Sequence, residues 1–257
     1  MEPIKSIIEI KNLSFNYDKT EILQNISLQI EANKFTVFLG QNGSGKSTLM
    51  RIIAGLIPYK NGNILVENNE LSNYSIQQRA KIIGFLPQKH KAVFPFSVQD
   101  VVLTGRVAYV KNIPQKNDLE IALKSIKKVG IEHLTNRNYT ELSGGEQQLV
   151  MIARALAQET KILLFDEPIS HLDYNNQIKF LNLVKQLVSE SYTIVSVLHD
   201  PNLAFQFGDK FMYVHNKNVT NIENSKPWEH PLAKEVFHEN IHQIMYNEKC
   251  VFIPKSL

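Results

Sequence analysis

The sequence predicts an α/β fold in which a parallel sheet covered by helices carries a glycine-rich loop and an inserted helical region. Three observations predict it. Continuously apolar runs such as FTVFL, residues 35–39, are typical of fully buried strands. A glycine-rich loop follows that run directly, and a helical pattern follows the loop. Strand patterns fade between residues 89 and 158 and then return around a crossover helix, the order that produces parallel pairing.

The composition bounds the class of protein. The chain has 257 residues, 43% hydrophobic and 21% charged, which is enough to bury a sizeable core. The net charge of +3 is too small to indicate a nucleic-acid partner, and the single cysteine, Cys250, excludes an internal disulfide and fits a reducing compartment. The start, MEPIKSIIEIKN, lacks signal-peptide features, and no run approaches transmembrane length. We therefore expect any membrane role to pass through a partner.

The first third of the chain alternates short strands with turns. Residues 6–15 (SIIEIKNLSF) and 25–30 (NISLQI) alternate apolar and polar side chains, as half-buried antiparallel strands do. Residues 63–68 (NILVEN) and 82–87 (IIGFLP) predict two further strands, with a turn at residues 68–69 between them.

Helices dominate the middle of the chain. Residues 97–106 (SVQDVVLTGR) open with a Ser-x-x-Asp start, and residues 118–130 (DLEIALKSIKKVG) place apolar side chains on one helical face and end at a glycine. Buried strands return in residues 161–166 (KILLFD) and 192–199 (YTIVSVLH), with a helix over residues 175–190 between them.

The glycine-rich loop GQNGSGKST indicates a phosphate site. The spacing Gly-x-x-x-x-Gly-Lys-Ser lets backbone N–H groups wrap a phosphate chain, while Lys46 reaches the terminal phosphates and Ser47 offers a hydroxyl to Mg²⁺. The helix that starts near Lys46 adds the positive end of its dipole. The expected nucleotide contacts are Gly40, Gln41, Asn42, Gly43, Ser44, Gly45, Lys46, Ser47 and Thr48.

Two acids follow a buried strand in ILLFDE. Asp166 and Glu167 lie at its carboxyl end, where open α/β sheets bind ligands. Adjacent strand residues point in opposite directions, so the two acids should have separate tasks. We expect Asp166 to hold Mg²⁺, and we expect Glu167 to polarise the water that attacks the γ-phosphate.

A second anion-binding helix start is predicted in LSGGEQQ. Ser143 and Glu146 form a capping box for the helix over residues 146–158. Gly144 and Gly145 carry no side chains at that helix start, which leaves the backbone N–H groups open to an anion.

With these motifs in this order, the chain resembles the ATP-binding cassette subunits of ABC transporters over nearly its whole length. Residues 40–48 match the Walker A loop, residues 142–147 the ABC signature, and Asp166 with Glu167 the Walker B pair. The remaining matches are Gln88 to the Q-loop glutamine, residues 170–173 to the D-loop, His199 to the switch histidine and Tyr17 to the aromatic that stacks on adenine.

The resemblance implies the ABC ATPase fold. That fold is a RecA-like P-loop NTPase core with an antiparallel β subdomain and an inserted α-helical subdomain. It implies one domain over residues 1–257, with the nucleotide-binding core in residues 1–88 and 159–257 and the helical signature subdomain in residues 89–158.

The resemblance also implies a shared ATP site. Two copies, most simply identical, would pair head to tail, with each ATP between Walker A of one chain and the signature of the other. The implied catalytic residues are Glu167, His199, Lys46 and Gln88, and the implied Mg²⁺ ligands are Ser47, Gln88 and Asp166. The implied ATP contacts are Tyr17, the loop from Gly40 to Thr48, Ser143, Gly144, Gly145, Glu146 and Asp173.

Partners and cargo are implied by less specific stretches. The family implies integral membrane permease subunits, supply by an external substrate-binding protein, a place on the cytoplasmic face of the cell membrane and no nucleic acid. Three stretches resemble the corresponding segments of cassettes that energise uptake of iron chelates (siderophores), haem and cobalamin: residues 97–110, 167–177 and 231–254. Arg106, in the helical region that faces the permease, is then a candidate interface residue.

Three alternatives stand beside this interpretation. Importers of free zinc or manganese share part of residues 97–110. Non-transport ABC ATPases usually carry two cassettes, a coiled coil or a zinc-binding insertion, which this sequence lacks. A degenerate cassette that binds ATP without hydrolysing it conflicts with the intact Lys46, Asp166, Glu167 and His199. Ile169 stands where the family usually has Thr. The hydroxyl lost beside the catalytic acid affects the expected rate of ATP hydrolysis, whereas Asp166 and Glu167 are both retained.

Overall fold

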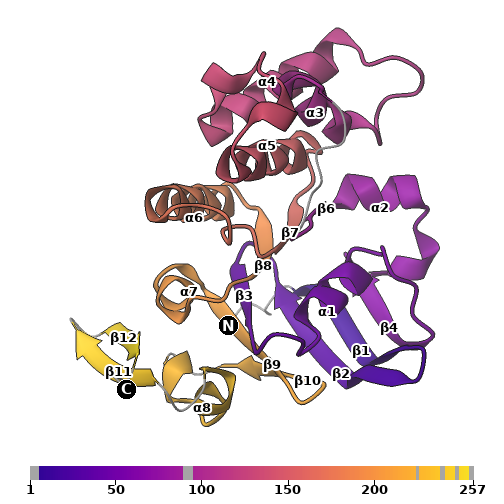
Figure 1. Cartoon of the computed structure of the whole chain (residues 1–257). Helices are drawn as coiled ribbons and strands as arrows, with labels where there is room; N and C mark the ends of the chain where they lie inside the picture. Colours follow the sequence, from indigo (N-terminus) through magenta and orange to yellow (C-terminus); the bar gives the residue numbers. More distant parts are fainter. Residues whose placement is uncertain (1–5, 89–94, 224–225, 238–240, 247–248, 255–257) are drawn as a thin grey trace.

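A six-stranded sheet forms the centre of the molecule (Figure 1). The computed structural model describes residues 6–88, 95–223, 226–237, 241–246 and 249–254, and these residues form all of the sheets below. The strand order is β10-β9-β3-β8-β7-β6, parallel throughout except for β10 against β9. The strands are β3 (Phe35–Leu39), β6 (Ile83–Leu86), β7 (Ile162–Asp166), β8 (Thr193–Val197), β9 (Lys210–His215) and β10 (Asn218–Ile222).

Every residue of β3, β7 and β8 is buried, which is why these runs are continuously apolar rather than alternating. Successive residues face opposite sides. In β3, Phe38 belongs to one hydrophobic core, whereas Val37 and Leu39 belong to the other. The predicted parallel α/β sheet is confirmed.

A second, antiparallel sheet covers one side of the central sheet. Its order is β2-β1-β4-β5, with β1 (Ser6–Tyr17), β2 (Thr20–Glu31), β4 (Asn61–Val66) and β5 (Asn69–Glu70). Strands β1 and β2 are longer than predicted. Helix α1 (Lys46–Ile53) shares a core with β1, β2 and β4, to which it contributes Leu49, Met50, Ile52 and Ile53. That packing fixes the start of α1, and with it the phosphate loop.

The structure contains a helix that sequence analysis missed, α2 (Ile76–Ile82), where only a turn between strands is predicted. Its N-cap, Ser75, forms a capping box with Gln78, a signal that was present in the sequence. None of the seven residues of α2 is buried, so the helix has no apolar stripe to reveal it.

The inserted helices lie together at the top of the molecule (Figure 1). They are α3 (Val98–Leu103), α4 (Lys116–Val129) and α5 (Gly144–Ala157), and they contact one another. As predicted, the Ser97 side chain caps α3, and α4 ends at Gly130 with φ of 79°. The predicted boundary at residue 89 falls within residues 89–94, outside the described residues.

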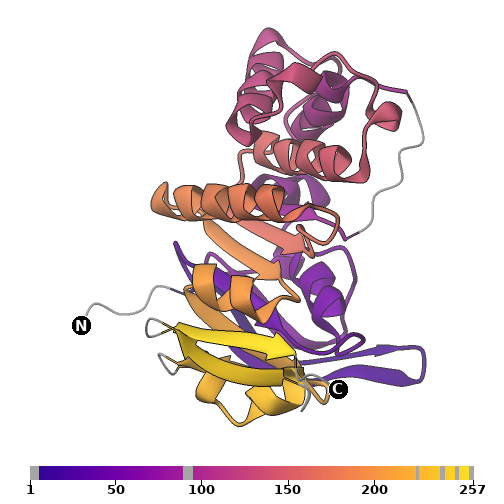
Figure 2. The ribbon, with the colours of Figure 1, turned by 60° about the vertical axis from the view of Figure 1, so that its left-hand side comes forward.

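Helices α6 (Tyr174–Ser189) and α7 (Pro201–Phe207) cover the face of the central sheet opposite α1 (Figure 2). The chain closes with α8 (Leu232–Phe237) and the hairpin of β11 (Ile241–Tyr246) and β12 (Lys249–Pro254). Residues 238–240 and 247–248 of that stretch lie outside the described residues. Among the helices of the described chain, none combines the length and the apolar character needed to cross a membrane.

Candidate functional site

The phosphate loop connects the carboxyl end of β3 to α1. It borders a cleft of about 420 Å³ whose lining residues include Asn42, Gly43, Lys46, Ser47 and Thr48 from the loop and helix, and Ile22, Gln88 and Glu167 from elsewhere. Gly45 is the N-cap of α1 with φ of 102°, a conformation that favours glycine. Gly40 is required by packing, because a Cβ at this position would lie 2.2 Å from the carbonyl oxygen of Val214.

Lys46 is buried and held inside the curve of the loop. Its Nζ donates to the carbonyl oxygens of Gly40 at 2.8 Å and Gln41 at 2.7 Å. Burial lowers the pKa of the Lys46 ammonium, although the nearby carboxylates of Glu167 and Asp166 oppose that shift. The ammonium is therefore positioned beside the cleft, where phosphate oxygens can compete for its N–H groups.

Asp166 and Ser47 form the part of the site that suits a cation. Ser47 Oγ donates to Asp166 Oδ1 at 2.8 Å, and Asp166 is fully buried. Burial raises the pKa of this carboxyl above its ordinary value. The other oxygen, Asp166 Oδ2, is buried and has no hydrogen-bond partner within the described part of the chain. Such an oxygen normally has a partner, and a hydroxyl with a carboxylate oxygen is the type of donor set that Mg²⁺ prefers. The residues present therefore fit the predicted metal.

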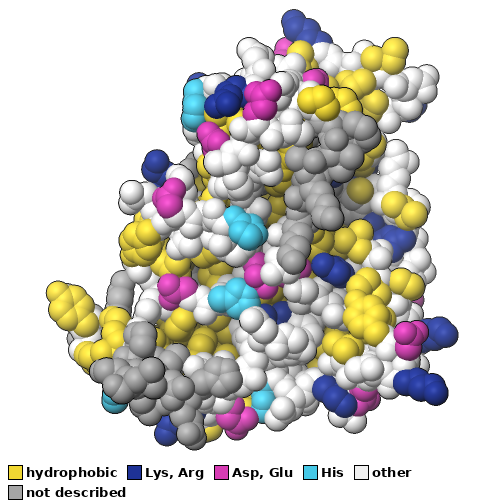
Figure 3. All heavy atoms as spheres, viewed as in Figure 1, with side chains coloured by type: hydrophobic (Ala, Val, Ile, Leu, Met, Phe, Trp, Pro, Cys, Tyr) yellow, Lys and Arg dark blue, Asp and Glu magenta, His cyan; other side chains and the backbone are white. Residues whose placement is uncertain are grey.

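Glu167 lies between two polar side chains. Gln88 Nε2 donates to Glu167 Oε2 at 2.6 Å, and His199 Nε2 lies 2.7 Å from Glu167 Oε1. These three residues follow β6, β7 and β8, which are neighbours in the sheet, so the carboxyl ends of three parallel strands bring them together. Glu167 thus faces the cleft, whereas Asp166, the last residue of β7, is directed to Ser47. Figure 3 shows histidine and acidic side chains near the middle of this face.

Tyr17 and Gln41, two of the predicted nucleotide contacts, are not among the described residues that line the cleft. Tyr17 ends β1, is 44% exposed, and packs edge-to-face on Phe15 at 4.8 Å; the residues that line the cleft do not include it. Gln41 turns its side chain away from the cleft, because its Nε2 donates to the carbonyl oxygen of Glu235 in α8 at 2.7 Å. No local pattern in the sequence indicates this contact, because it joins residues 194 positions apart.

The signature residues form the predicted capping box. Ser143 is the N-cap of α5. Its Oγ accepts a hydrogen bond from the backbone N–H of Glu146 at 3.3 Å and donates one to Glu146 Oε2 at 2.8 Å. These bonds to Ser143 lower the pKa of Glu146. A Cβ at Gly144 would meet no atom within 4 Å, so packing within the chain does not require this glycine, whereas a Cβ at Gly145 would lie 3.4 Å from the His171 carbonyl oxygen.

The structure does not bring the signature to the cleft of its own chain. Ser143, Gly144, Gly145 and Glu146 are absent from the described residues that line it. Figure 1 places α5 with the inserted helices and α1 among the antiparallel strands. Asp173 is also outside the cleft; it is exposed and caps α6, where its carboxylate accepts from Asn176 N at 2.9 Å, a bond that lowers its pKa.

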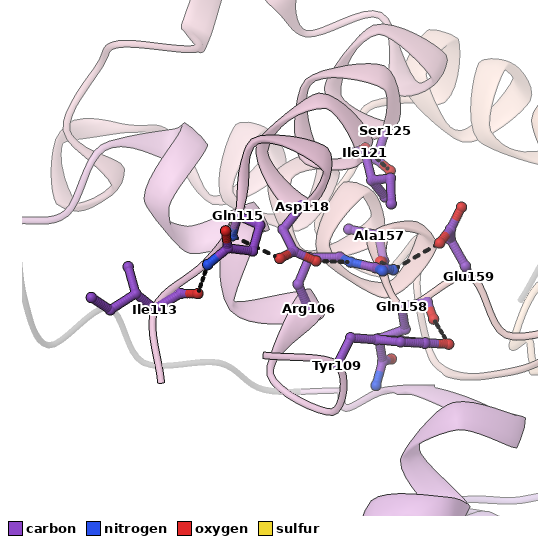
Figure 4. A network of polar contacts seen from close by, with 10 residues as sticks. All are labelled: Arg106, Tyr109, Ile113, Gln115, Asp118, Ile121, Ser125, Ala157, Gln158 and Glu159. Carbon is purple, nitrogen blue, oxygen red and sulfur yellow. Dashed lines mark hydrogen bonds and ion pairs between the residues drawn. The ribbon is translucent and has the colours of Figure 1, made fainter. Parts of the chain in front are cut away.

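The prediction that Arg106 is an interface residue is wrong. The residue is only 3% exposed and forms the centre of a polar network (Figure 4). Its Nε lies 3.1 Å from Asp118 Oδ1, its Nη1 donates to the Ala157 carbonyl at 2.8 Å and to Glu159 Oε2 at 2.9 Å, and its guanidinium stacks on Tyr109 at 4.0 Å. These donors thus point into the molecule, and the arginine has no surface to offer a partner.

Ile169, which stands where a Thr was expected, is also buried. It is 6% exposed and belongs to the hydrophobic core that includes Phe165 and Phe180. The apolar side chain therefore suits its surroundings.

Gln148, on α5, donates to the carbonyl oxygen of Pro168, the residue before Ile169, at 2.9 Å. Gln148 was not predicted as a site residue.

Comparison with known families supports these motifs. The profile of the family described as ABC transporter matches residues 23–170. An uncharacterized ABC transporter ATP-binding protein of Haemophilus influenzae is 37% identical over 253 residues, 92% of this chain and 94% of the relative. The petrobactin import ATP-binding protein of Bacillus anthracis is 35% identical over 250 residues, 96% of this chain and 89% of that protein. The hemin import ATP-binding protein of Agrobacterium fabrum is 33% identical over 222 residues, with 83% and 84% covered.

Solved structures give the same result. A chain of a transporter described as of the metal-chelate type, in an inward-facing conformation, superposes with a TM-score of 0.80 at 31% identity, over 97% of this chain and 98% of that one. A bacterial ABC transporter cassette solved as a dimer superposes with a TM-score of 0.76 at 29% identity, over 84% of this chain and 99% of that one.

Proposed function

This chain belongs to the ATP-binding cassette family of ABC transporters, and from that premise we propose that it is the ATP-hydrolysing subunit of a metal-chelate importer. Members of the family bind nucleotide and couple ATP hydrolysis to transport. The observation that carries the proposal is Glu167, held between Gln88 and His199 at the edge of the cleft that the phosphate loop lines.

Nucleotide and metal contacts follow from the cleft. Backbone N–H groups of residues 40–48 and the Lys46 ammonium bind the phosphate chain, and Tyr17 stacks on the adenine. Ser47, Asp166 and Gln88 would hold Mg²⁺, which would neutralise phosphate charge when bound with ATP. Asp166 Oδ2, buried without a hydrogen-bond partner among the described residues, supports this assignment.

Glu167 orients the attacking water in this proposal. Its carboxylate faces the cleft, and the amide of Gln88 and the imidazole of His199 fix its direction. Lys46 stabilises the charge on the γ-phosphoryl group as it leaves. His199 also contacts the γ-phosphate, and Gln88 links the site to the inserted helices that grip the permease.

Two copies complete each site. Each chain presents a phosphate loop at one place and a signature at another, and the open space around Gly144 leaves the start of α5 accessible to a second chain's ATP. Ser143, Glu146 and Asp173 then contact the nucleotide of the partner. In this arrangement residues 1–88 and 159–257 are the nucleotide-binding core and residues 89–158 are the helical signature subdomain.

The proposed cargo is an iron chelate such as a siderophore, or haem or cobalamin. The relatives named for petrobactin and hemin import, and the structural similarity to a metal-chelate-type transporter, support this class. We propose that the chain lies on the cytoplasmic face of the membrane, where permease subunits hold it. An external binding protein delivers the cargo to those permease subunits.

Reconstitution with each candidate permease tests the proposal. Vesicles should take up a ferric siderophore, haem or cobalamin only when ATP is present on the cassette side. Glu167→Gln should keep ATP binding but lose most turnover and uptake, because the water is no longer oriented. Transport of only free metal ions, amino acids or sugars, or export, would contradict the cargo; unchanged ATPase in Glu167→Gln would contradict the catalytic role.

A further inference from the structure

A buried glutamine connects the signature helix to the loop that carries the catalytic carboxylate. Gln148 lies on α5, five positions after Ser143, and is 7% exposed. Its Nε2 donates to the carbonyl oxygen of Pro168 at 2.9 Å. Pro168 is itself buried and directly follows Glu167. One hydrogen bond therefore links a helix of the inserted region to the residue next to Glu167.

The backbone at Glu167 depends on its surroundings. Glu167 has φ of 53°, a left-handed conformation that is uncommon for a residue with a side chain and costs free energy unless its surroundings support it. Ser170 Oγ donates to the Glu167 carbonyl at 3.1 Å, and Gln177 of α6 donates to the carbonyls of Ile169 and Leu172 at 3.2 and 3.1 Å. Gln148 supplies a hydrogen bond that reaches this loop from α5.

We propose that Gln148 is a positioning residue that sets the direction of Glu167 in its own chain. The proposal rests on the proposed function, in which Glu167 orients the attacking water. Pro168 has a fixed φ and no N–H, so its backbone can absorb a displacement of its carbonyl only through ψ, and the remainder passes to the peptide that follows Glu167. A shift of α5 is therefore transmitted to the carboxylate through the Gln148 hydrogen bond.

This link has a consequence for the two ATP sites of the dimer. The signature at the start of α5 serves the ATP held by the partner, whereas Glu167 serves the ATP held by its own chain. Ser143 and Gln148 lie on one helix about 8 Å apart along its axis, a length over which a helix moves as a rigid rod. Through Gln148, ATP bound against the signature at one site thus changes the orientation of the Glu167 carboxylate at the other site.

Mixed dimers of the full chain separate this role from a structural one. One chain carries Glu167→Gln, so only the partner's Glu167 can act, and a single turnover of labelled ATP is measured. Gln148→Met, which removes the donor at similar length, is placed either in the chain with the active Glu167 or in the chain with Glu167→Gln. The two dimers have the same substitutions in total and differ only in which chain carries Gln148→Met.

Gln148→Met in the chain with the active Glu167 should slow the single turnover about tenfold, since small misplacements of catalytic groups are costly. In the chain with Glu167→Gln it should leave the rate within about twofold of the parent mixed dimer, because the signature of that chain is intact. Slowing confined to the dimer with Gln148→Met in the Glu167→Gln chain would show that Gln148 supports the signature helix, because that signature serves the active site. Equal slowing in both arrangements would contradict a positioning role within one chain, and no slowing in either would remove Gln148 from positioning.

Two further measurements keep the outcomes distinct. Gln148→Leu also removes the donor, and it replaces the Met variant in the same comparison if that variant does not purify as folded protein. The parent mixed dimer must turn over once, and the Glu167→Gln homodimer must not. Failure of either condition contradicts the proposed function, whereas failure of the two-arrangement comparison overturns the role of Gln148 alone.

Discussion

Replacing Arg106 by Met should destabilise the fold rather than weaken a partner contact. The substitution keeps an apolar side chain but removes the buried guanidinium and its three hydrogen bonds. The Asp118 carboxylate and the Ala157 carbonyl then lose the Arg106 donors. Breaking a buried ion pair by removing one partner costs about 3–5 kcal/mol. Glu159 adds little to this, because its side chain is 53% exposed.

Urea unfolding followed by circular dichroism measures this loss. The midpoint should fall at an unchanged m-value, and a loss of this size corresponds to a melting temperature lower by about 10 °C for a chain of this length. The matched control is Lys116→Met, which removes an ion pair of 3.9 Å to Glu120 whose side chains are 91% and 62% exposed. That control should change the free energy of unfolding by less than about 0.5 kcal/mol.

A difference between wild type and Arg106→Met of under about 1 kcal/mol would refute the buried-network reasoning. The pH dependence gives an independent check. The backbone N–H of Gln115, and then Arg106, lower the pKa of Asp118. A lowered carboxyl pKa contributes stability above the ordinary value of about 3.9 that is lost as the pH falls through the lowered value. The difference in free energy of unfolding between wild type and Arg106→Met should therefore become smaller below about pH 4.

Two more predictions concern the shared site and the phosphate loop. A mixed dimer of Lys46→Ala with Ser143→Arg has one site with both lesions and one with neither, so it should retain ATPase activity that each mutant homodimer lacks; a mixture as inactive as both parents contradicts independent shared sites. Gly40→Ala should destabilise the chain by about 1–3 kcal/mol, because its Cβ would overlap the Val214 carbonyl oxygen. Gly144→Ala, in open space, should leave the melting temperature of the free chain unchanged; equal losses in the two alanine variants would contradict the steric argument.

Local features of the fold could be predicted because short stretches of chain determine them. The order of strand, loop and helix around residues 35–53, the caps at Ser97 and Ser143, and the end of α4 at Gly130 all depend on residues within a few positions of one another. Helix α2 carries an equally local capping box but buries no residue, so the apolar pattern that reveals other helices is absent.

The candidate site was partly predictable for a related reason. In a parallel sheet the carboxyl ends of neighbouring strands meet at one edge, so side chains that follow β6, β7 and β8 can be expected there. The motifs supplied their identities. Their contacts, with Gln88 and His199 on either side of Glu167, needed the strand order 8-7-6, which no local pattern contains.

The sequence by itself determined the class of fold, the phosphate loop and the types of residue available for ATP chemistry, because these depend on spacing along the chain. Only the tertiary structure decided which side chains are free to act. Arg106 resembles a surface arginine until its partners, 12, 51 and 53 positions away, are brought around it. Gln148 is only part of a motif until packing brings it to Pro168, 20 positions away. Burial and long-range hydrogen bonds are properties of the assembled core, so residue type and local spacing alone cannot specify them.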